Sequence, residues 1–563
     1  MQEILRDEWG FEGFVVSDAG AISLMVDGHH WADNYTVASA EAINAGCDLD
    51  LGNEYSTLPA ALATGLTTVD TLDRSLRRLI RRRIREGAFD PPALVPWSKY
   101  GLEQVDTAAN RALAKEAAVQ SMVLLKNDGG FLPFDEHSFP NGRIAVIGPN
   151  ADRPYGLLGN YPPCLDGPYS DIIPDCVVRT PLWGIQSYVQ RHHPDVVVTY
   201  DVGVPDLSSY NTSLIHDAIV NASLADVIVV VGGLGTCEVP DAGPGPNCLE
   251  AEGLDRNSLV LPLIQQVLLD KLTSLGKPVV LVTMGGAPLA LSPSVLSLAI
   301  PSILHAWYGG EEEGTALADL LFGARSPSAK LPVTFPLDDS QLPTYTNDSV
   351  QAMPCGRTYR YTTCVPLYSF AYGLSYTQFV YSKGDRSSIL SVSHVAANDT
   401  TTVVHVAGQV SNVGGYAEAD EIVMAYVTVI PFSVDGQMSP PSLPRTELKA
   451  FSRMHVASSG GERPFRLSMP ISELRLLDDT GDWSLLQGVY VVYAGGSAPG
   501  SRGMYVDGHE QHDQVLQYEM PSTCPPAIRK AWAMQQRERG LAAEELQLEM
   551  SIASGLVGTF TVC

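Results

Sequence analysis

The chain has 563 residues, 63 of them acidic and 36 basic, and its formal net charge is −27. A surface this negative repels phosphates, so we expect no nucleic-acid partner and no anionic membrane partner. A neutral ligand such as a sugar is compatible with the charge. The longest uncharged stretch, residues 278–304, is interrupted by glycines and prolines, and no membrane helix is predicted there.

The most informative segment lies near the beginning of the chain, where residues 10–20 read Gly-Phe-Glu-Gly-Phe-Val-Val-Ser-Asp-Ala-Gly. The apolar, β-branched run at 14–16 predicts a short buried strand. Asp18 stands where that strand should end, and parallel α/β proteins place catalytic side chains at this position. On the local sequence alone, a turn or helix-capping aspartate fits equally well.

The next elements in chain order predict an α/β region. A basic helix is expected over 75–87, with its arginines on a solvated face. Prolines then begin a linker, and a helix is expected over 109–125. Five short apolar strands alternate with helical patterns after it, which is typical of a parallel sheet with crossover connections. These strands are expected at 144–147, 196–200, 227–231, 279–283 and 303–306.

The patterning changes in the last third of the chain. Residues 336–395 are rich in Pro, Tyr and Ser and predict a long ordered connector. From about 400 to 510 strands follow one another without helices, which favours an antiparallel β-sandwich. The strands are expected at 403–406, 422–429, 465–469 and 488–493. The last fifty residues include a charged helical run up to Glu549 and match no known pattern.

Cysteines and glycosylation sequences indicate an oxidising, secretory environment. Three close cysteine pairs flank turn-rich segments, as loop-closing disulfides would, and free thiols are the alternative. The pairs are Cys164 with Cys176, Cys237 with Cys248, and Cys355 with Cys364. Asn-x-Ser/Thr sites begin at Asn34, Asn211, Asn221, Asn347 and Asn398.

The residues after Met1 carry no signal-peptide pattern, which disagrees with the secretory features. We therefore expect that the natural N-terminus, with its signal peptide, is missing, and that Met1 is internal to a longer protein.

The segment around Asp18 resembles the nucleophile motif of family-3 glycoside hydrolases, in which the aspartate of Gly-Phe-Val-Val-Ser-Asp attacks the anomeric carbon. The resemblance continues through the α/β region and implies an order of domains. It implies a C-terminal remnant of a (β/α)8 barrel at 1–90 that bears the nucleophile, a linker at 91–105, an α/β sandwich domain at 106–335 with a mostly parallel sheet, a connector at 336–395, a fibronectin type III-like domain at 396–510, and a tail at 511–563.

Retaining glycoside hydrolysis needs a second carboxyl group, about 5–5.5 Å from the nucleophile, as acid and base. Residues 249–256 read Leu-Glu-Ala-Glu-Gly-Leu-Asp-Arg and resemble the β-xylosidase branch of the family. The resemblance implies that Glu250 is this group, with Glu252 as second choice. Asp255 and Arg256 are expected to form an ion pair that orients the loop. Without the family, an acidic first helical turn explains the glutamates.

Other residues bear on the site less directly. His29 and His30 resemble a histidine near the sugar subsite of xylosidase relatives, and a solvated helix end is the alternative. Ala19 stands where relatives carry tryptophan or cysteine, which leaves the sugar selectivity open. The glutamates at 311–313 predict a helix start and not a metal site. No spacing indicates zinc or a phosphate loop, so we predict no metal and no cofactor.

The sequence thus predicts a secreted, retaining, exo-acting β-glycosidase, most similar to xylan 1,4-β-xylosidases, whose partner is an oligosaccharide or glycoside. One alternative is a β-glucosidase or a bifunctional α-L-arabinofuranosidase/β-xylosidase. The other is a catalytically inactive carbohydrate-binding or adhesion fragment that lacks most of the barrel.

Overall fold

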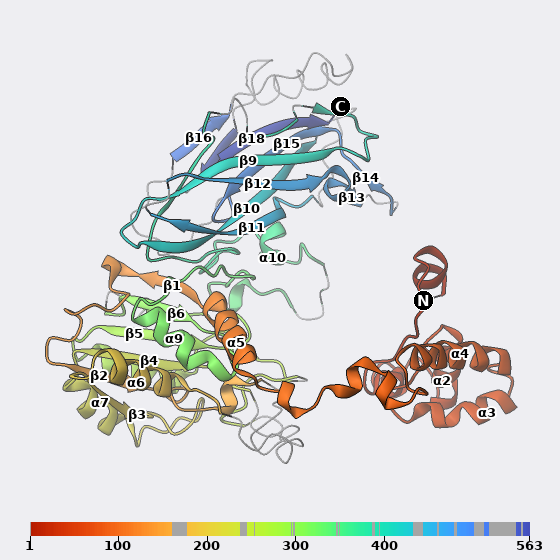
Figure 1. Ribbon diagram of the computed structural model, residues 1–563, viewed down its shortest axis with the longest axis horizontal. Coiled ribbons are helices and arrows are strands. Elements are labelled where there is room, and N and C mark those ends of the chain that lie inside the picture. Colours follow the sequence, from red (N-terminus) through yellow and green to blue (C-terminus); the bar gives the residue numbers. More distant parts are fainter. Residues whose placement is uncertain are drawn as a thin grey trace. The chain divides into compact units, whose positions relative to one another are not determined.

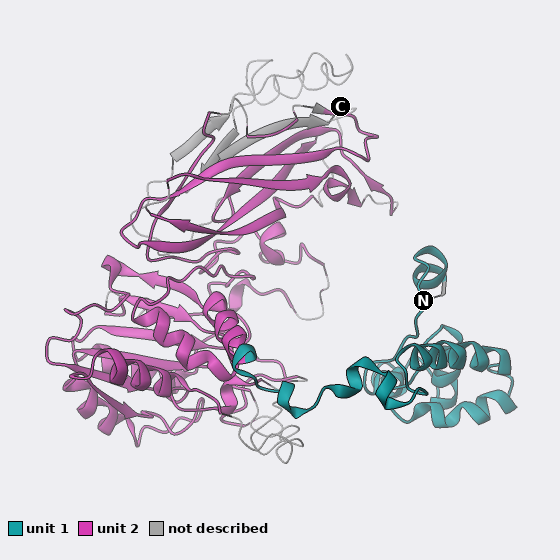
Figure 2. Cartoon of the chain, viewed as in Figure 1, with its two compact units in different colours: residues 1–110 teal, residues 111–563 magenta. Residues whose placement is uncertain are grey.

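The computed structural model describes residues 2–159, 177–236, 245–431 and 443–499 and the strands at 512–516, 548–552 and 556–562. Positions 253, 294, 297, 298, 345, 346, 348, 386–388, 393, 459, 460 and 478–480 lie outside this description. The chain divides into two compact units, residues 1–110 and residues 111–563 (Figure 2). Among the described residues, no helix is both long and apolar enough to cross a membrane.

Unit 1 is built mainly from helices (Figure 1). The basic helix predicted over 75–87 is confirmed, but it begins earlier because the Thr68 side chain caps it by accepting a hydrogen bond from the Thr71 N–H. Short 3₁₀ helices occupy much of the predicted linker. The elements are a π-helix (Gln2–Glu8), α1 (Ala21–Asp27), α2 (Tyr35–Asn44), α3 (Leu58–Ala63), α4 (Val69–Arg85) and 3₁₀ turns at Glu54–Thr57, Pro92–Leu94, Pro96–Lys99 and Leu102–Gln104.

The buried strand predicted at 14–16 is wrong in extent and in burial. It is reduced to one parallel bridge between Val16 and Leu49, whose side chains are 45% and 40% exposed. A parallel strand becomes continuous and buried when neighbours pair with both of its edges and helices cover both of its faces. Within the described residues of unit 1, the segment at 14–16 has a partner on one edge only, namely the segment around Leu49.

Unit 2 begins with a six-stranded sheet of order β1-β6-β5-β4-β2-β3. β1 runs antiparallel to β6 and all other pairs are parallel, so this is an α/β fold with a mixed, mostly parallel sheet. The five predicted strands are confirmed to within two residues. The strands are β1 (Val123–Asn127), β2 (Arg143–Ile147), β3 (Val197–Asp201), β4 (Val227–Gly233), β5 (Val279–Met284) and β6 (Ser302–His305).

Helices cover both faces of this sheet and make three layers (Figure 1). β4 and β5 are buried along their whole length, as expected for strands between two helical layers. One face packs against α5 (Ala108–Ser121), α6 (Pro181–His192) and α9 (Glu313–Leu321), and the other against α7 (Ile215–Ser223) and α8 (Leu263–Thr273).

The predicted helix over 109–125 is wrong at its C-terminal end. α5 ends at Ser121, and Val123–Asn127 form β1, which pairs with β6 at the edge of the sheet. Leu124 and Leu125 are almost fully buried in that strand. A short buried apolar run fits a helix or a strand equally in its periodicity, and here the open edge of β6 decides the outcome.

The chain then forms two facing sheets that share one hydrophobic core. One has the order β11-β10-β15-β18-β8 and the other β12-β9-β7. All pairs are antiparallel except β18 with β8. The four strands predicted between 400 and 510 are present. The strands are β7 (Phe379–Ser382), β8 (His394–Val395), β9 (Val403–Asn412), β10 (Glu418–Pro431), β11 (Glu447–Ala457), β12 (Arg463–Pro470), β15 (Gly488–Gly495) and β18 (Leu556–Val562).

Smaller elements complete unit 2. α10 (Thr358–Tyr361) lies in the predicted connector, and two further strand pairs are β13 (Leu476–Leu477) with β14 (Trp483–Ser484) and β16 (His512–Leu516) with β17 (Leu548–Ile552). β18 belongs to the stretch predicted as a tail, and it pairs with β15 inside the sandwich. The bounds of the six predicted segments stay predictions.

The contact between α6 and α9 yields a test of packing. A Cβ on Gly184 would lie 1.9 Å from the backbone oxygen of Gly314, so Gly184→Ala must push the two helices apart. We expect it to lower the free energy of unfolding of unit 2 by about 3 kcal/mol, measured by urea denaturation. Gly415→Ala is the control, because no atom lies within 4 Å of the position that its Cβ would take. Equal losses in the two variants would contradict the steric explanation.

Candidate active site

Asp18 lies in unit 1 at the end of the segment that bridges to Leu49. Its side chain is exposed, and its Oδ1 accepts a hydrogen bond of 2.9 Å from the Ala19 N–H. Backbone hydrogen bonds to the segment around Leu49 hold the chain on both sides of it, from Ser17 N to Leu49 O at 2.9 Å and from Gly20 N to Leu51 O at 3.1 Å. Asp18 is therefore an exposed carboxylate on a backbone that is fixed at both ends.

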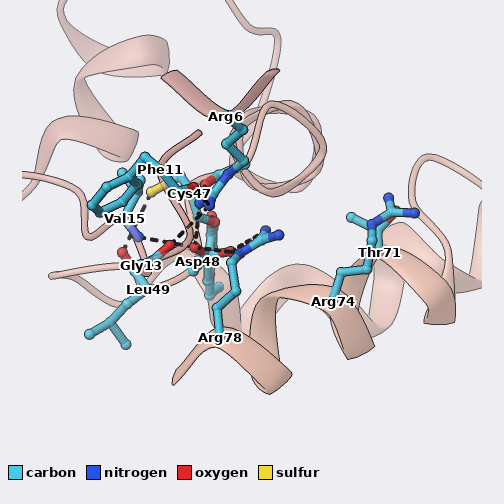
Figure 3. A network of polar contacts seen from close by, with 12 residues as sticks. Arg6, Phe11, Gly13, Val15, Cys47, Asp48, Leu49, Thr71, Arg74 and Arg78 are labelled. Carbon is cyan, nitrogen blue, oxygen red and sulfur yellow. Dashed lines mark hydrogen bonds and ion pairs between the residues drawn. The ribbon is translucent and has the colours of Figure 1, made fainter. Parts of the chain in front are cut away.

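The fixed backbone depends on Asp48, whose side chain is fully buried (Figure 3). Its carboxylate accepts a hydrogen bond of 3.0 Å from the Val15 N–H and forms ion pairs with Arg6 at 2.9 Å and Arg78 at 2.6 Å. The Val15 carbonyl in turn accepts from the backbone N–H groups of Asp48 and Leu49. One carboxylate thus links the N-terminal helix, α4 and the segment that carries Asp18.

Glu250 lies in unit 2, at the edge of the sheet where the parallel strands end. Its Oε1 accepts hydrogen bonds from the backbone N–H of Gly286, after β5, and from the Tyr308 hydroxyl at 2.7 Å, after β6. Arg256 lies with its Nε 3.3 Å from Oε2. The Glu250 side chain is 14% exposed. Three loops at the carboxyl ends of neighbouring strands therefore converge on this one side chain.

Glu252 differs from Glu250 in exposure. It lies at the tip of a tight turn that is closed by reciprocal backbone hydrogen bonds between Ala251 and Leu254, and its side chain is exposed. In the part of the chain that the structure describes, its carboxylate has no hydrogen-bond or ion-pair partner. The expected pair of Asp255 with Arg256 is not found among the described contacts, since Arg256 faces Glu250 and donates to the Pro288 carbonyl.

The turn that carries Tyr308 is fixed by a hydrogen bond to the buried side chain of Glu313. The Gly309 N–H donates to Oε2 of Glu313 at 2.6 Å, and burial raises the pKa of Glu313 to about 8. Burial, and secondarily Glu250, raises the pKa of the Tyr308 phenol, which therefore remains a hydrogen-bond donor. Burial also lowers the pKa of the neighbouring His305 to about 3, so that imidazole is neutral.

Sequence reasoning missed both Asp48 and Tyr308 as parts of the site. Asp48 lies 42 residues from Arg6 and 30 from Arg78, and no local spacing connects the three. Tyr308 follows a predicted parallel strand directly, as does the loop of Glu250. The rule that side chains meet at the carboxyl ends of parallel strands could have identified it.

The remaining candidate residues lie outside these two clusters. His29 and His30 are exposed after α1, and Nδ1 of His30 lies 2.9 Å from the Val26 carbonyl oxygen. The glutamates at 311–313 begin a helix, as predicted, and Glu312 pairs with Arg179. Of the five glycosylation candidates, Asn221 is half-buried and its amide donates to Asp201, while Asn34, Asn211, Asn347 and Asn398 are exposed.

The disulfide predicted between Cys355 and Cys364 is confirmed, with Cα atoms 5.2 Å apart. Cys248 is disulfide-bonded, but its predicted partner Cys237 lies outside the described residues. Cys164 and Cys176 also lie outside them. Cys47, for which no pair was predicted, is a buried free thiol.

Comparison with known proteins identifies the class. Residues 1–82 match the model of the glycosyl hydrolase family 3 N-terminal domain, and residues 122–376 match the model of the glycosyl hydrolase family 3 C-terminal domain. Together these ranges hold more than half of the chain, in the order in which the family carries them. The chain belongs to glycosyl hydrolase family 3, which confirms the resemblance seen in the sequence.

Particular relatives are consistent with this membership. A β-xylosidase of Formosa agariphila is 32% identical over 514 residues, which are 88% of this chain and 65% of the relative. A solved GH3 exo-β-xylosidase in complex with a xylobiose aziridine probe has a TM-score of 0.74 and 27% identity, covering 88% of this chain and 61% of the other. A β-glucosidase from Erythrobacter marinus has a TM-score of 0.70 and 27% identity, covering 89% and 64%.

This chain therefore spans less than two thirds of the length of these relatives.

The Asp48 network yields a paired test within one helix. Arg78 and Arg82 both lie in α4, but Arg78 pairs with the buried Asp48 and Arg82 with the exposed Glu86. We expect Arg78→Gln to destabilise unit 1 by about 3 kcal/mol or more, because it leaves a buried carboxylate short of a partner. Arg82→Gln should cost less than about 0.5 kcal/mol.

Peptide-resolved hydrogen exchange in increasing urea measures both variants in unit 1. The interpretation is contradicted if residues 13–20 keep their protection in Arg78→Gln, or if the two variants lose stability equally.

Proposed function

We propose that the chain is part of a retaining, exo-acting β-glycosidase that removes terminal β-D-xylosyl residues in carbohydrate catabolism, as xylan 1,4-β-xylosidases do. The observation that carries this proposal is the exposed carboxylate of Asp18 on a segment fixed by the buried Asp48 network. Membership of family 3 and the β-xylosidase relative support it. The activity, the substrate and the secreted location are all parts of this proposal.

The proposed reaction has two steps. In the first, an Asp18 oxygen attacks the anomeric carbon, the bond to the leaving oxygen breaks, and a carboxylic acid gives that oxygen its proton. In the second, the group that gave up its proton, now a carboxylate, takes a proton from water. The water oxygen attacks the anomeric carbon, and the bond between that carbon and the Asp18 oxygen breaks. Neither step requires a metal or an organic cofactor.

The contacts of the two glutamates bear on which of them is the acid and base. An acid must direct an oxygen at the leaving group, and Glu250 is largely buried with both oxygens facing donors of the protein itself. Glu252 is exposed at the tip of its turn. Sequence similarity alone puts Glu250 first, whereas accessibility supports Glu252. We therefore propose Glu252 as the acid and base and keep Glu250 as the alternative.

The finer description of the fold belongs to the same proposal. The helices of unit 1, with one parallel bridge, fit the C-terminal part of a (β/α)8 barrel. The two facing sheets between residues 379 and 562 fit a fibronectin type III-like sandwich. The confirmed disulfide and the four exposed asparagines of the glycosylation candidates support secretion.

Substitution of the three carboxylates tests the mechanism. Asp18→Asn should abolish turnover, because an amide cannot serve as the nucleophile. Glu252→Gln should lower kcat by at least about a hundredfold for poor leaving groups and much less for activated ones, which need no protonation. Azide should restore the second step of Glu252→Gln and yield a β-glycosyl azide. If this pattern belongs to Glu250→Gln instead, Glu250 is the acid and base.

A panel of substrates tests the sugar. We expect release of nitrophenol from nitrophenyl β-D-xyloside with a kcat/KM at least tenfold above that for the β-D-glucoside and the α-L-arabinofuranoside. A preference for either of the other two glycosides would make one of the alternatives correct. No release from any of them by the full-length protein that contains this chain would favour a binding protein without catalysis.

A further inference from the structure

Glu250 has three described polar partners within the protein, and they occupy both of its carboxylate oxygens. Its partners come from three loops, which follow β4, β5 and β6. Gly286 comes so close that a Cβ at this position would lie 3.3 Å from Oε1 of Glu250 and 3.4 Å from the Tyr308 ring. The backbone at residue 286 is therefore shaped to receive this carboxylate.

The short loop that follows Glu250 has few other attachments. The backbone N–H groups of Leu249 and Glu250 both donate to the Gly235 carbonyl, at 3.0 and 3.4 Å. The backbone hydrogen bonds described for Ala251 and Leu254 join these two residues to each other. The side chains of Glu250 and Arg256 lie at the two ends of the turn and face one another. Glu252 stands between them, so its position follows from theirs.

The Tyr308 side of this arrangement is also fixed. Trp307 has a φ of +61°, in the left-handed region, and its Nε1–H donates to the Ser121 carbonyl at 3.0 Å. The Gly309 N–H donates to the buried Glu313. A bulky residue with positive φ is held there only by its surroundings, and such residues are frequent at functional sites. The turn thus presents the Tyr308 hydroxyl in one direction, toward Glu250.

We propose that Glu250 and Tyr308 are positioning residues: their hydrogen bond anchors the turn at 251–254 and so directs Glu252 toward the substrate. The inference rests on the proposed function in one respect, since it takes Glu252 as the acid and base. It adds a role for two residues that act through Glu252. Charge-assisted hydrogen bonds of this kind are the strong ones, which suits an anchor.

Hydrogen exchange of the 563-residue chain tests the anchor without any turnover. Tyr308→Phe removes only the hydroxyl that donates to Glu250, and Glu250→Ala removes the acceptor. We expect amide exchange over residues 249–255 to become about tenfold faster in Tyr308→Phe and faster still in Glu250→Ala. Amides of β4 and β5 should keep their protection in both variants.

The matched control is Tyr376→Phe, which removes another half-buried hydroxyl of unit 2, one that donates to the Leu320 carbonyl at 2.8 Å. A purely structural loss would lower the melting temperature similarly in both Tyr→Phe variants and leave exchange at 249–255 unchanged. That result, or equal exchange at 249–255 in both variants, would overturn the proposal.

Measurements of enzyme kinetics provide an independent test of the anchor. With an active protein, Glu250→Ala and Tyr308→Phe should lower kcat more for poor than for good leaving groups, as Glu252→Gln does but by a smaller factor, because a misplaced Glu252 protonates the leaving oxygen less well. Azide should rescue neither variant, because the Glu252 carboxylate is still present. If azide rescues Glu250→Gln while Glu252→Gln keeps normal kinetics, Glu250 is the acid and base and the anchor is overturned. If the full-length protein that contains this chain releases no sugar, the proposed function fails, while the exchange experiment still decides the anchor.

Discussion

The buried carboxylate of Asp48 is the interaction on which unit 1 depends. It brings together Arg6 from the N-terminal helix, Arg78 from α4 and the N–H of Val15, three residues before Asp18. A buried charge is costly unless it is fully paired, so this arrangement forms as a whole or not at all. The network specifies one arrangement of three segments, and that arrangement determines the position of Asp18, the exposed nucleophile candidate.

In unit 2 the candidate carboxylates are positioned by a sheet and not by a buried ion-pair network. Its parallel strands β4, β5 and β6 end at the same edge of the sheet, and the loops that follow them converge on Glu250. β4 and β5 are buried along their whole length, and such strands form a scaffold that positions the loops at its edge. In both units a carboxylate with little exposure makes hydrogen bonds to the protein close in sequence to an exposed carboxylate. Asp48 accepts from the N–H of Val15, three residues before Asp18, and Glu250 lies two residues before Glu252.

The sequence predicted the α/β sheet well because buried parallel strands are short apolar runs between helices, and each pattern is local. It failed at Val123–Leu125, where an antiparallel edge partner decides between helix and strand, and at 14–16, where burial depends on neighbours far along the chain. The same limit applies to the site. Asp18 and the two glutamates stand in recognisable local motifs, whereas Asp48 and Tyr308 act through contacts with residues 30 to 58 positions away.

The close contact of Gly184 with Gly314 connects helix packing to the site. Residues 311–314 follow the turn of Tyr308 directly and are bound to the segment before α6: the Arg179 N–H donates to Glu311, the Gly314 N–H donates to Arg179, and Glu312 pairs with Arg179. The separation of α6 and α9 therefore sets the height of that turn above the sheet. Over evolutionary time, a larger residue at either glycine would move the Tyr308 turn as well as the core, and we expect related chains to keep both glycines although neither contacts Glu250 or Glu252.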